Sequence, residues 1–249
     1  MDKIKQENLG IPKRGKYLIA GIKTGMILRD GWTTEKQSRP YSFDFEGEPE
    51  ITLGFEDEYI LERNKEFAHL SLDDCEYMYT GSDFCTKLLN FDGFMLHASA
   101  VVVGNRAYLF SAPSGTGKST HTALWMDAFG KDGAYILNDD KPVIRIIDGK
   151  IHTFGTPWSG KTDQNKNADV CLGGICFLER SAENWIKPVS GTDALYGVLN
   201  QTIRPSDEKK MTNLLDVLDK TLKDAKTWRM GCNISKDAAI MAFNAMKGE

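Results

Sequence analysis

A glycine-rich segment between an apolar run and a helix-like run constrains this chain more than any other feature. The segment, residues 112–120, has the sequence APSGTGKST and follows the apolar run at residues 107–110. Gly115 and Gly117 permit positive φ angles and let a ligand come close to the backbone. A helix is predicted from Ser119 to Phe129, and its first N–H groups have no partner within the helix. The pattern predicts a strand, a tight loop and a helix, as in an α/β fold.

The same segment matches the Walker A phosphate-binding pattern, with Ala112 in place of the first glycine. Successive backbone N–H groups and the positive end of the helix dipole would bind a phosphate chain. Lys118 supplies a mobile cation for the β- and γ-phosphates, and the Ser119 hydroxyl is a ligand for Mg²⁺. We therefore predict an ATP and Mg²⁺ site whose nucleotide-binding residues are Ser114, Gly115, Thr116, Gly117, Lys118, Ser119 and Thr120.

Two adjacent carboxylates end the next predicted strand. Asp139 and Asp140 follow the apolar run at residues 135–137, and Asp139 lies 139 − 118 = 21 residues after Lys118. That spacing suffices for a helix and a return strand, so the carboxylates are expected at the sheet edge that holds the phosphate loop. Neighbouring residues of a strand point to opposite faces, so both can serve the site only if the strand ends there. The alternative is that one of them is a turn or capping residue.

A histidine interrupts the long apolar run at residues 94–103, which is predicted to be one strand. His97 is either a core histidine with a satisfied hydrogen bond or a site residue near the transferred phosphate. Its strand is expected to form a hairpin, through Gly104-Asn105, with the strand that precedes the loop.

The chain is predicted to have two parts. Residues 1–90 are interpreted as a small β-rich region, with strands at 17–22, 41–45 and 51–55 and a late helix beginning near Ser82. Residues 91–249 are interpreted as the nucleotide-binding α/β domain, with a helical C-terminal part.

Composition and charge argue against several classes of binding partner. The net charge is 31 − 35 = −4, so no overall positive field would attract nucleic acid or an anionic membrane. No window reaches the length of a membrane span, and the charged N-terminus has no signal-peptide core. Five dispersed cysteines form neither a disulfide framework nor a zinc site. We expect a cytoplasmic protein that binds neither nucleic acid nor membranes.

Residues 96–161 resemble HPr kinase/phosphorylase and, beyond it, the nucleotide core of phosphoenolpyruvate carboxykinases. The resemblance rests on Leu96-His97-Ala98, on Ser114 to Ser119, and on Leu137-Asn-Asp-Asp140. It implies a P-loop core of mixed sheet flanked by helices, and often an oligomer. It also implies that Asp139 is the general base, Asp140 a metal ligand or its neighbour, and His97 a residue near the phosphate, with the order within the aspartate pair left open.

The family's glutamate-arginine-glycine signature is not evident after the aspartates. Residues 155–161, GTPWSGK, can take its place, with Lys161 neutralising charge on the phosphoryl group. An ordinary loop is the alternative. Arg180 and Arg204 are possible anion contacts, although surface positions are the commoner role of arginine.

The resulting prediction is an ATP- and Mg²⁺-dependent kinase that phosphorylates a serine-like hydroxyl of a peptide, protein or small molecule. The alternatives are a nucleotide-binding switch without transfer and a carboxykinase-like enzyme acting on a small carboxylic acid.

Overall fold

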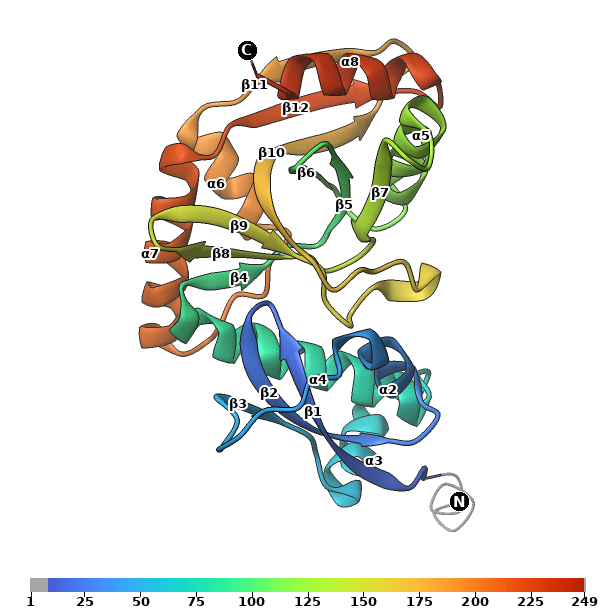
Figure 1. Ribbon diagram of the computed structural model, residues 1–249, viewed down its shortest axis with the longest axis vertical. Coiled ribbons are helices and arrows are strands. Elements are labelled where there is room, and N and C mark those ends of the chain that lie inside the picture. Colours follow the sequence, from blue (N-terminus) through green and yellow to red (C-terminus); the bar gives the residue numbers. More distant parts are fainter. Residues whose placement is uncertain (1–8, 249) are drawn as a thin grey trace.

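The fold was described from a computed structural model, which covers residues 9–248. In this range the chain forms a three-stranded sheet and a curled mixed sheet of nine strands, each with its own helices (Figure 1). We call the part from β1 to α4 the small lobe and the part from β4 onward the large lobe. The N-terminal residues 1–8, for which a signal peptide was not expected, lie outside the described range.

The small lobe combines a β-hairpin with helices. β1 and β2 pair antiparallel, and β3 pairs parallel with β2. Ala20 and Gly21 have φ angles of 52° and 75°, so they form a tight turn where one continuous strand was predicted. The elements of this lobe are β1 (Pro12–Ile19), β2 (Ile22–Arg29), α2 (Thr33–Ser38), η1 (Arg39–Tyr41), β3 (Ile51–Leu53), α3 (Asp57–Glu66) and α4 (Leu72–Leu88), and η2 (Leu89–Phe91) follows.

The small lobe is less β-rich than predicted. The strand predicted at residues 41–45 is absent, because Pro40 stands at the start of a 3₁₀ turn there. The helix predicted from Ser82 begins eleven residues earlier, where Ser71 and Asp74 form a capping box. Helices α2 and α3 were not predicted at all.

The large sheet is built around one long strand, β10, which pairs with β9, β6 and β12. The main strand order is β4-β8-β9-β10-β6-β5-β7, and β12 and β11 extend it beside β10. The elements are β4 (Gly93–Met95), β5 (Ala98–Val103), β6 (Arg106–Ser111), α5 (Lys118–Phe129), β7 (Ala134–Asn138), β8 (Val143–Ile147), β9 (Lys150–Phe154), η3 (Gly160–Thr162), β10 (Asp169–Arg180), β11 (Trp185–Pro188), α6 (Gly191–Leu199), α7 (Glu208–Asp224), β12 (Thr227–Cys232) and α8 (Lys236–Met246).

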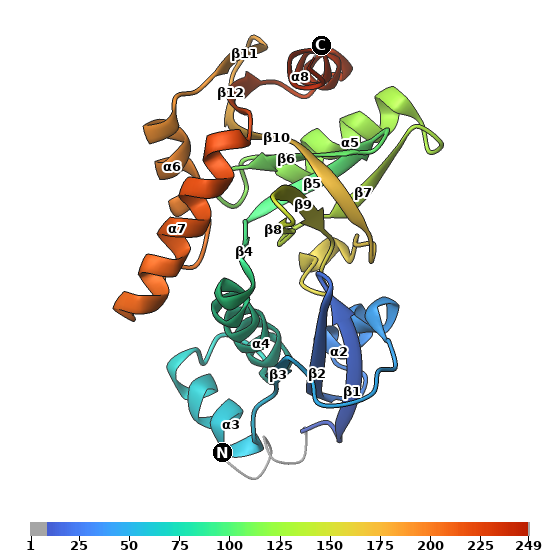
Figure 2. The same ribbon diagram turned by 60° about the vertical axis from the view of Figure 1, so that its left-hand side comes forward.

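Helices cover both faces of this sheet (Figure 2). Leu214 and Leu218 of α7 belong to one buried cluster, and Trp125 of α5 and Ala239 of α8 belong to another. The C-terminal part is therefore helical as predicted, but it also supplies β11 and β12. In the described range no helix is both long and apolar enough to span a bilayer.

Strand direction brings the predicted site residues to one edge. β5 lies between β6 and β7 and runs antiparallel to both, so β6 and β7 end at the same edge, where β5 begins. The strand predicted over residues 94–103 is broken between β4 and β5, and His97 lies in that break. The residues that follow β6 and β7 and precede β5 therefore meet at this edge of the sheet.

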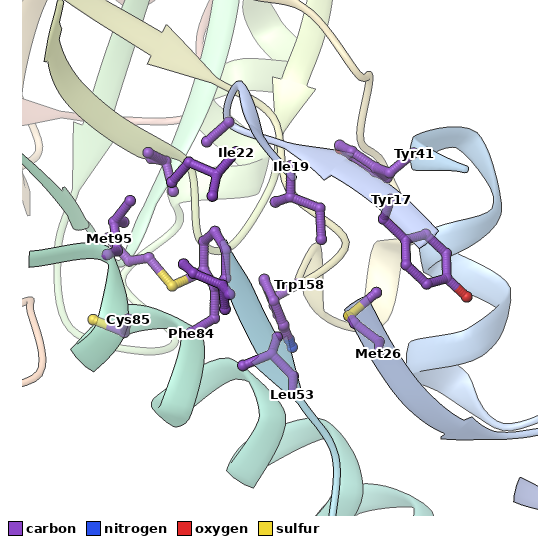
Figure 3. Close-up of a cluster of buried hydrophobic side chains, with 14 of the residues drawn as sticks. Tyr17, Ile19, Ile22, Met26, Tyr41, Leu53, Phe84, Cys85, Met95 and Trp158 are labelled. Carbon is purple, nitrogen blue, oxygen red and sulfur yellow. The ribbon is translucent and has the colours of Figure 1, made fainter. Parts of the chain in front are cut away.

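The lobes share a buried cluster (Figure 3). Ile22 and Phe84 of the small lobe pack there with Met95, Val143 and Trp158 of the large lobe. The Trp158 ring stacks on Phe84 with 4.9 Å between centroids, and both side chains are inaccessible to solvent.

Candidate functional site

The loop at residues 112–120 follows β6 and leads into α5, as predicted. Gly115 and Gly117 have φ angles of +76° and +118°, a range that favours glycine. A Cβ added at either position would meet no atom within 4 Å. The backbone therefore faces open space, and the first N–H groups of α5 lie beside it.

Lys118 bends back over this loop. Its Nζ donates to the Ala112 carbonyl at 2.9 Å and to the Pro113 carbonyl at 3.5 Å. The side chain is only 8% exposed, and burial lowers the pKa of its ammonium, while Asp140 and Asp139 oppose that shift. The ammonium thus donates to loop carbonyl oxygens, and the oxygens of an anionic ligand can replace them as acceptors.

A cavity of about 330 Å³ collects almost every residue that the sequence singled out. Of the residues predicted to bind nucleotide, only Thr116 does not line it, because it lines a neighbouring cavity instead. Ser159 and Gly160, from the predicted segment 155–161, also line it, and so does Thr162, which was not predicted. The predicted residues in the cavity are His97, Ser114, Gly115, Gly117, Lys118, Ser119, Thr120, Asp139, Asp140 and Lys161.

The two aspartates differ in their surroundings. Both carboxylate oxygens of Asp139 accept hydroxyl hydrogen bonds, from Ser99 at 2.5 Å and from Thr162 at 2.8 Å. Ser99 is in turn 2.7 Å from the Thr122 hydroxyl of α5. Asp139 is 7% exposed. It is therefore a fixed carboxylate held beside the helix that carries Ser119.

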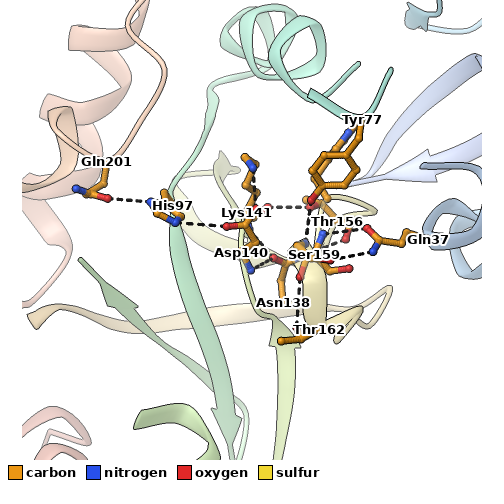
Figure 4. A network of polar contacts seen from close by, with 12 residues as sticks. Gln37, Tyr77, His97, Asn138, Asp140, Lys141, Thr156, Ser159, Thr162 and Gln201 are labelled. Atoms are coloured by element: carbon orange, nitrogen blue, oxygen red, sulfur yellow. Dashed lines mark hydrogen bonds and ion pairs between the residues drawn. The ribbon is translucent and has the colours of Figure 1, made fainter. Parts of the chain in front are cut away.

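Asp140 is more open. Its carboxylate pairs with the Lys141 ammonium at 2.7 Å and lies 3.4 Å from Nε2 of His97 (Figure 4). Asn138 ends β7, and its side-chain oxygen accepts the backbone N–H groups of Asp140 and Lys141. This turn ends the strand and its alternation of side chains, which is the condition stated above for both carboxylates to reach one site. Both line the same cavity.

His97 is held by Gln201, which follows α6. The Gln201 side-chain oxygen lies 3.0 Å from Nδ1, and its backbone carbonyl accepts the His97 N–H at 2.7 Å. Both ring nitrogens therefore have a polar neighbour, the Gln201 amide oxygen at Nδ1 and the Asp140 carboxylate at Nε2. Burial and then the nearby Lys118 lower the pKa of His97, while Asp140 opposes that shift.

The neighbouring cavity, of about 550 Å³, shares Gly115, Gly117 and Thr120 with the first. Arg180 lines it and supports the loop from outside, donating to the carbonyls of Gly115 at 2.5 Å and Thr116 at 3.4 Å. Arg204 is exposed and lines neither cavity.

No cluster of three or more histidine, cysteine or carboxylate side chains suited to a metal occurs within residues 9–248. Besides hydroxyl side chains, the cavity is lined by two carboxylates, Asp139 and Asp140, and Ser119 at the start of α5 is the hydroxyl that the sequence assigned to the metal. Such a sparse donor set fits Mg²⁺, which keeps several waters and takes its other ligands from phosphate.

Comparison with known proteins gives only a distant likeness. No protein-family profile matches the chain, and no curated protein matches it. Among solved structures, the Hpr(Ser) kinase/phosphatase from Coxiella burnetii aligns with a TM-score of 0.34 and 10% sequence identity. The alignment covers 61% of this chain and 95% of that structure.

Proposed function

We propose that this protein is an ATP- and Mg²⁺-dependent phosphotransferase whose acceptor is a serine-like hydroxyl of a peptide, protein or small molecule. One observation supports this proposal most strongly. An open glycine loop at a helix N-terminus, a lysine and two carboxylates line the same cavity. Phosphoryl transfer needs this combination, because catalysis consists of positioning the phosphates and stabilising their charge.

In this proposal the phosphates lie along Gly115 to Thr120, where Lys118 exchanges its loop carbonyls for phosphate oxygens. Ser119 and one aspartate would hold Mg²⁺, which neutralises charge on the transferred group. We assign the nucleoside to the neighbouring cavity. That cavity shares Gly115, Gly117 and Thr120 with the first and is also lined by the apolar side chains of Leu124 and Ile234.

The surroundings of the aspartates favour one order of roles. Asp139 is fixed by two hydroxyl donors and adjoins α5, which suits a metal ligand. Asp140 lies 3.4 Å from Nε2 of His97, close enough for a proton taken up by either group to be shared between them. We therefore assign proton acceptance to the Asp140–His97 pair, and charge neutralisation at the phosphoryl group to Lys161.

The test begins with nucleotide binding. Lys118→Ala should weaken MgATP binding and lower phosphate transfer by about 10²-fold or more. The matched control is Lys131→Ala, on an exposed lysine just after α5. Binding is measured at equilibrium, and transfer is measured with γ-labelled ATP on candidate peptides, free serine, small alcohols and small carboxylic acids.

The outcomes separate the candidate functions. Lys118-dependent binding with label on a hydroxyl supports the kinase. The same binding without transfer to any acceptor indicates a nucleotide-dependent switch. Label recovered on a small carboxylic acid indicates a carboxykinase-like enzyme. Unchanged nucleotide affinity in Lys118→Ala would contradict all three, because each needs the loop.

A further inference from the structure

The segment that closes one side of the cavity is tied to the small lobe. We call residues 156–162 the site loop, and four of them, Ser159 to Thr162, line the cavity. Gln37 of α2 donates through Nε2 to the Gly160 carbonyl at 3.0 Å. Its Oε1 accepts the Ser159 N–H at 3.4 Å. From α4, the Tyr77 hydroxyl oxygen accepts the Gly160 N–H at 2.8 Å (Figure 4).

These contacts hold the backbone at Gly160, which packs against Asp140. Gly160 has a φ angle of +70°, and a Cβ added there would lie 3.0 Å from the Asp140 Cβ. The backbone N–H and C=O groups of Gly160 are therefore both held from the small lobe, while its α-carbon packs against the aspartate. A shift of Gly160 would move its neighbours Ser159 and Lys161 in the cavity.

The same small-lobe contacts reach both carboxylates indirectly. Thr162, two residues after Gly160, donates to Asp139. The Lys141 ammonium that pairs with Asp140 lies over the Tyr77 ring, 5.5 Å from its centroid. Gln37 is 5% exposed. Water therefore has little access to its amide group, and the hydrogen bonds to the site loop are its main polar contacts.

We propose that Gln37 and Tyr77 are positioning residues, through which the small lobe holds the site loop in the geometry that phosphate transfer requires. This inference rests on the proposed function. Neither side chain lines the cavity, so neither is a catalytic residue. Their effect should fall on the rate of transfer and not on nucleotide affinity, because the phosphate-binding loop belongs to a different segment.

The variants are chosen to keep volume. Tyr77→Phe removes only the hydroxyl that accepts from Gly160, and Gln37→Met removes both polar groups of that side chain. Tyr79→Phe, on the same helix, is the control for the first, and its ring packs near Phe55 and Tyr59 instead. Lys36→Met, at the exposed neighbouring position of α2, is the control for the second.

Three measurements on the full chain test the inference. Hydrogen exchange of the amides at 158–162 should quicken in Tyr77→Phe and Gln37→Met but not in the controls. MgATP affinity should stay within about twofold, while release of labelled phosphate to water should slow by about tenfold or more.

Faster exchange together with an unchanged rate of phosphate release would overturn the inference, as would unchanged exchange in both variants. A failure of the proposed function has a different signature. In that case the unaltered protein shows no Lys118-dependent MgATP binding, whatever the exchange data show.

Discussion

At the scale of single residues, the two adjacent aspartates lie in different surroundings, and the proposed difference in their roles rests on this. Asp139 is nearly buried and accepts from Ser99 and Thr162, whereas Asp140 faces His97 and Lys141. A metal ligand benefits from being fixed, and a proton acceptor needs an accessible lone pair. The turn at Asn138 makes this division possible, because it releases Asp140 from the strand.

The division predicts different kinetics for the two amide variants. Asp140→Asn should keep MgATP affinity and lower the transfer rate by about 10²-fold or more, because the proton acceptor is lost. Asp139→Asn should instead weaken Mg²⁺ binding and so raise the Mg²⁺ concentration needed for half-maximal transfer, measured by titrating the metal at fixed ATP. Full transfer activity in Asp140→Asn would show that the roles are reversed, as the resemblance first implied.

Several site residues could not have been found from sequence. Ser99, Thr122, Thr162 and Gln201 are common residue types without diagnostic spacing, and they reach the site through strand pairing and a long connection. Lys118 and Asp139 were predictable because the glycine pattern and the strand end are local signals. Hydroxyls that orient a carboxylate leave no such pattern.

At the scale of one element, α5 contains a buried histidine that makes its stability depend on pH. His121 is 2% exposed, and its Nε2 accepts from the Trp125 indole N–H at 3.2 Å. Burial lowers the pKa of His121 to about 4. The folded protein therefore keeps the ring neutral where an unfolded chain would protonate it.

The pH dependence follows from linkage. Between the ordinary histidine pKa of about 6.5 and the folded value, only the unfolded chain takes up the proton, so the free energy of unfolding falls as the pH falls. Above about pH 6.5 the ring is neutral in both the folded and the unfolded chain. Between there and pH 4, the titration of His121 should lower the free energy of unfolding by about 3 kcal/mol.

His121→Gln keeps an acceptor for Trp125 and removes this titration. Denaturant unfolding of both proteins from pH 7 to pH 4 should show the variant losing less stability. Parallel curves would refute the assignment, because the carboxylates that titrate in this range are common to both.

The elements themselves were predicted unevenly. β6, α5 and β7 were predicted correctly, because apolar runs there are bounded by glycine or aspartate turns. α4 was predicted too short. Its first half contains several acidic residues, and its apolar residues there do not form a clear helical stripe in the sequence. Local alternation near Tyr41 suggested a strand, but Pro40 determined the backbone there.

At the scale of the whole molecule, the two lobes are joined by a common core. The side chain of Trp158, from the large lobe, packs against Phe84 of α4 in the small lobe, and its indole N–H lies 3.3 Å from the Thr80 hydroxyl. The residue adjoins Ser159, so the packing between the lobes and the shape of the cavity depend on the same segment.

Trp158→Ala should therefore cost about 3–5 kcal/mol and uncouple the lobes, because it removes a fully buried aromatic ring. We expect denaturant unfolding to change from one transition to two. Trp158→Phe, which keeps a ring against Phe84, should retain a single transition with a smaller loss. A single, unshifted transition in Trp158→Ala would show that the lobes are held together elsewhere.

The hairpin between β5 and β6 turns at Gly104, at the end of these strands away from the site. Six residues of β5 separate that turn from His97, a span of about 20 Å. A fluorophore or an affinity tag attached at this exposed bend would stand a full strand away from the candidate site. The fold thus offers an attachment point for single-molecule or immobilised assays in which the candidate site remains open to solution.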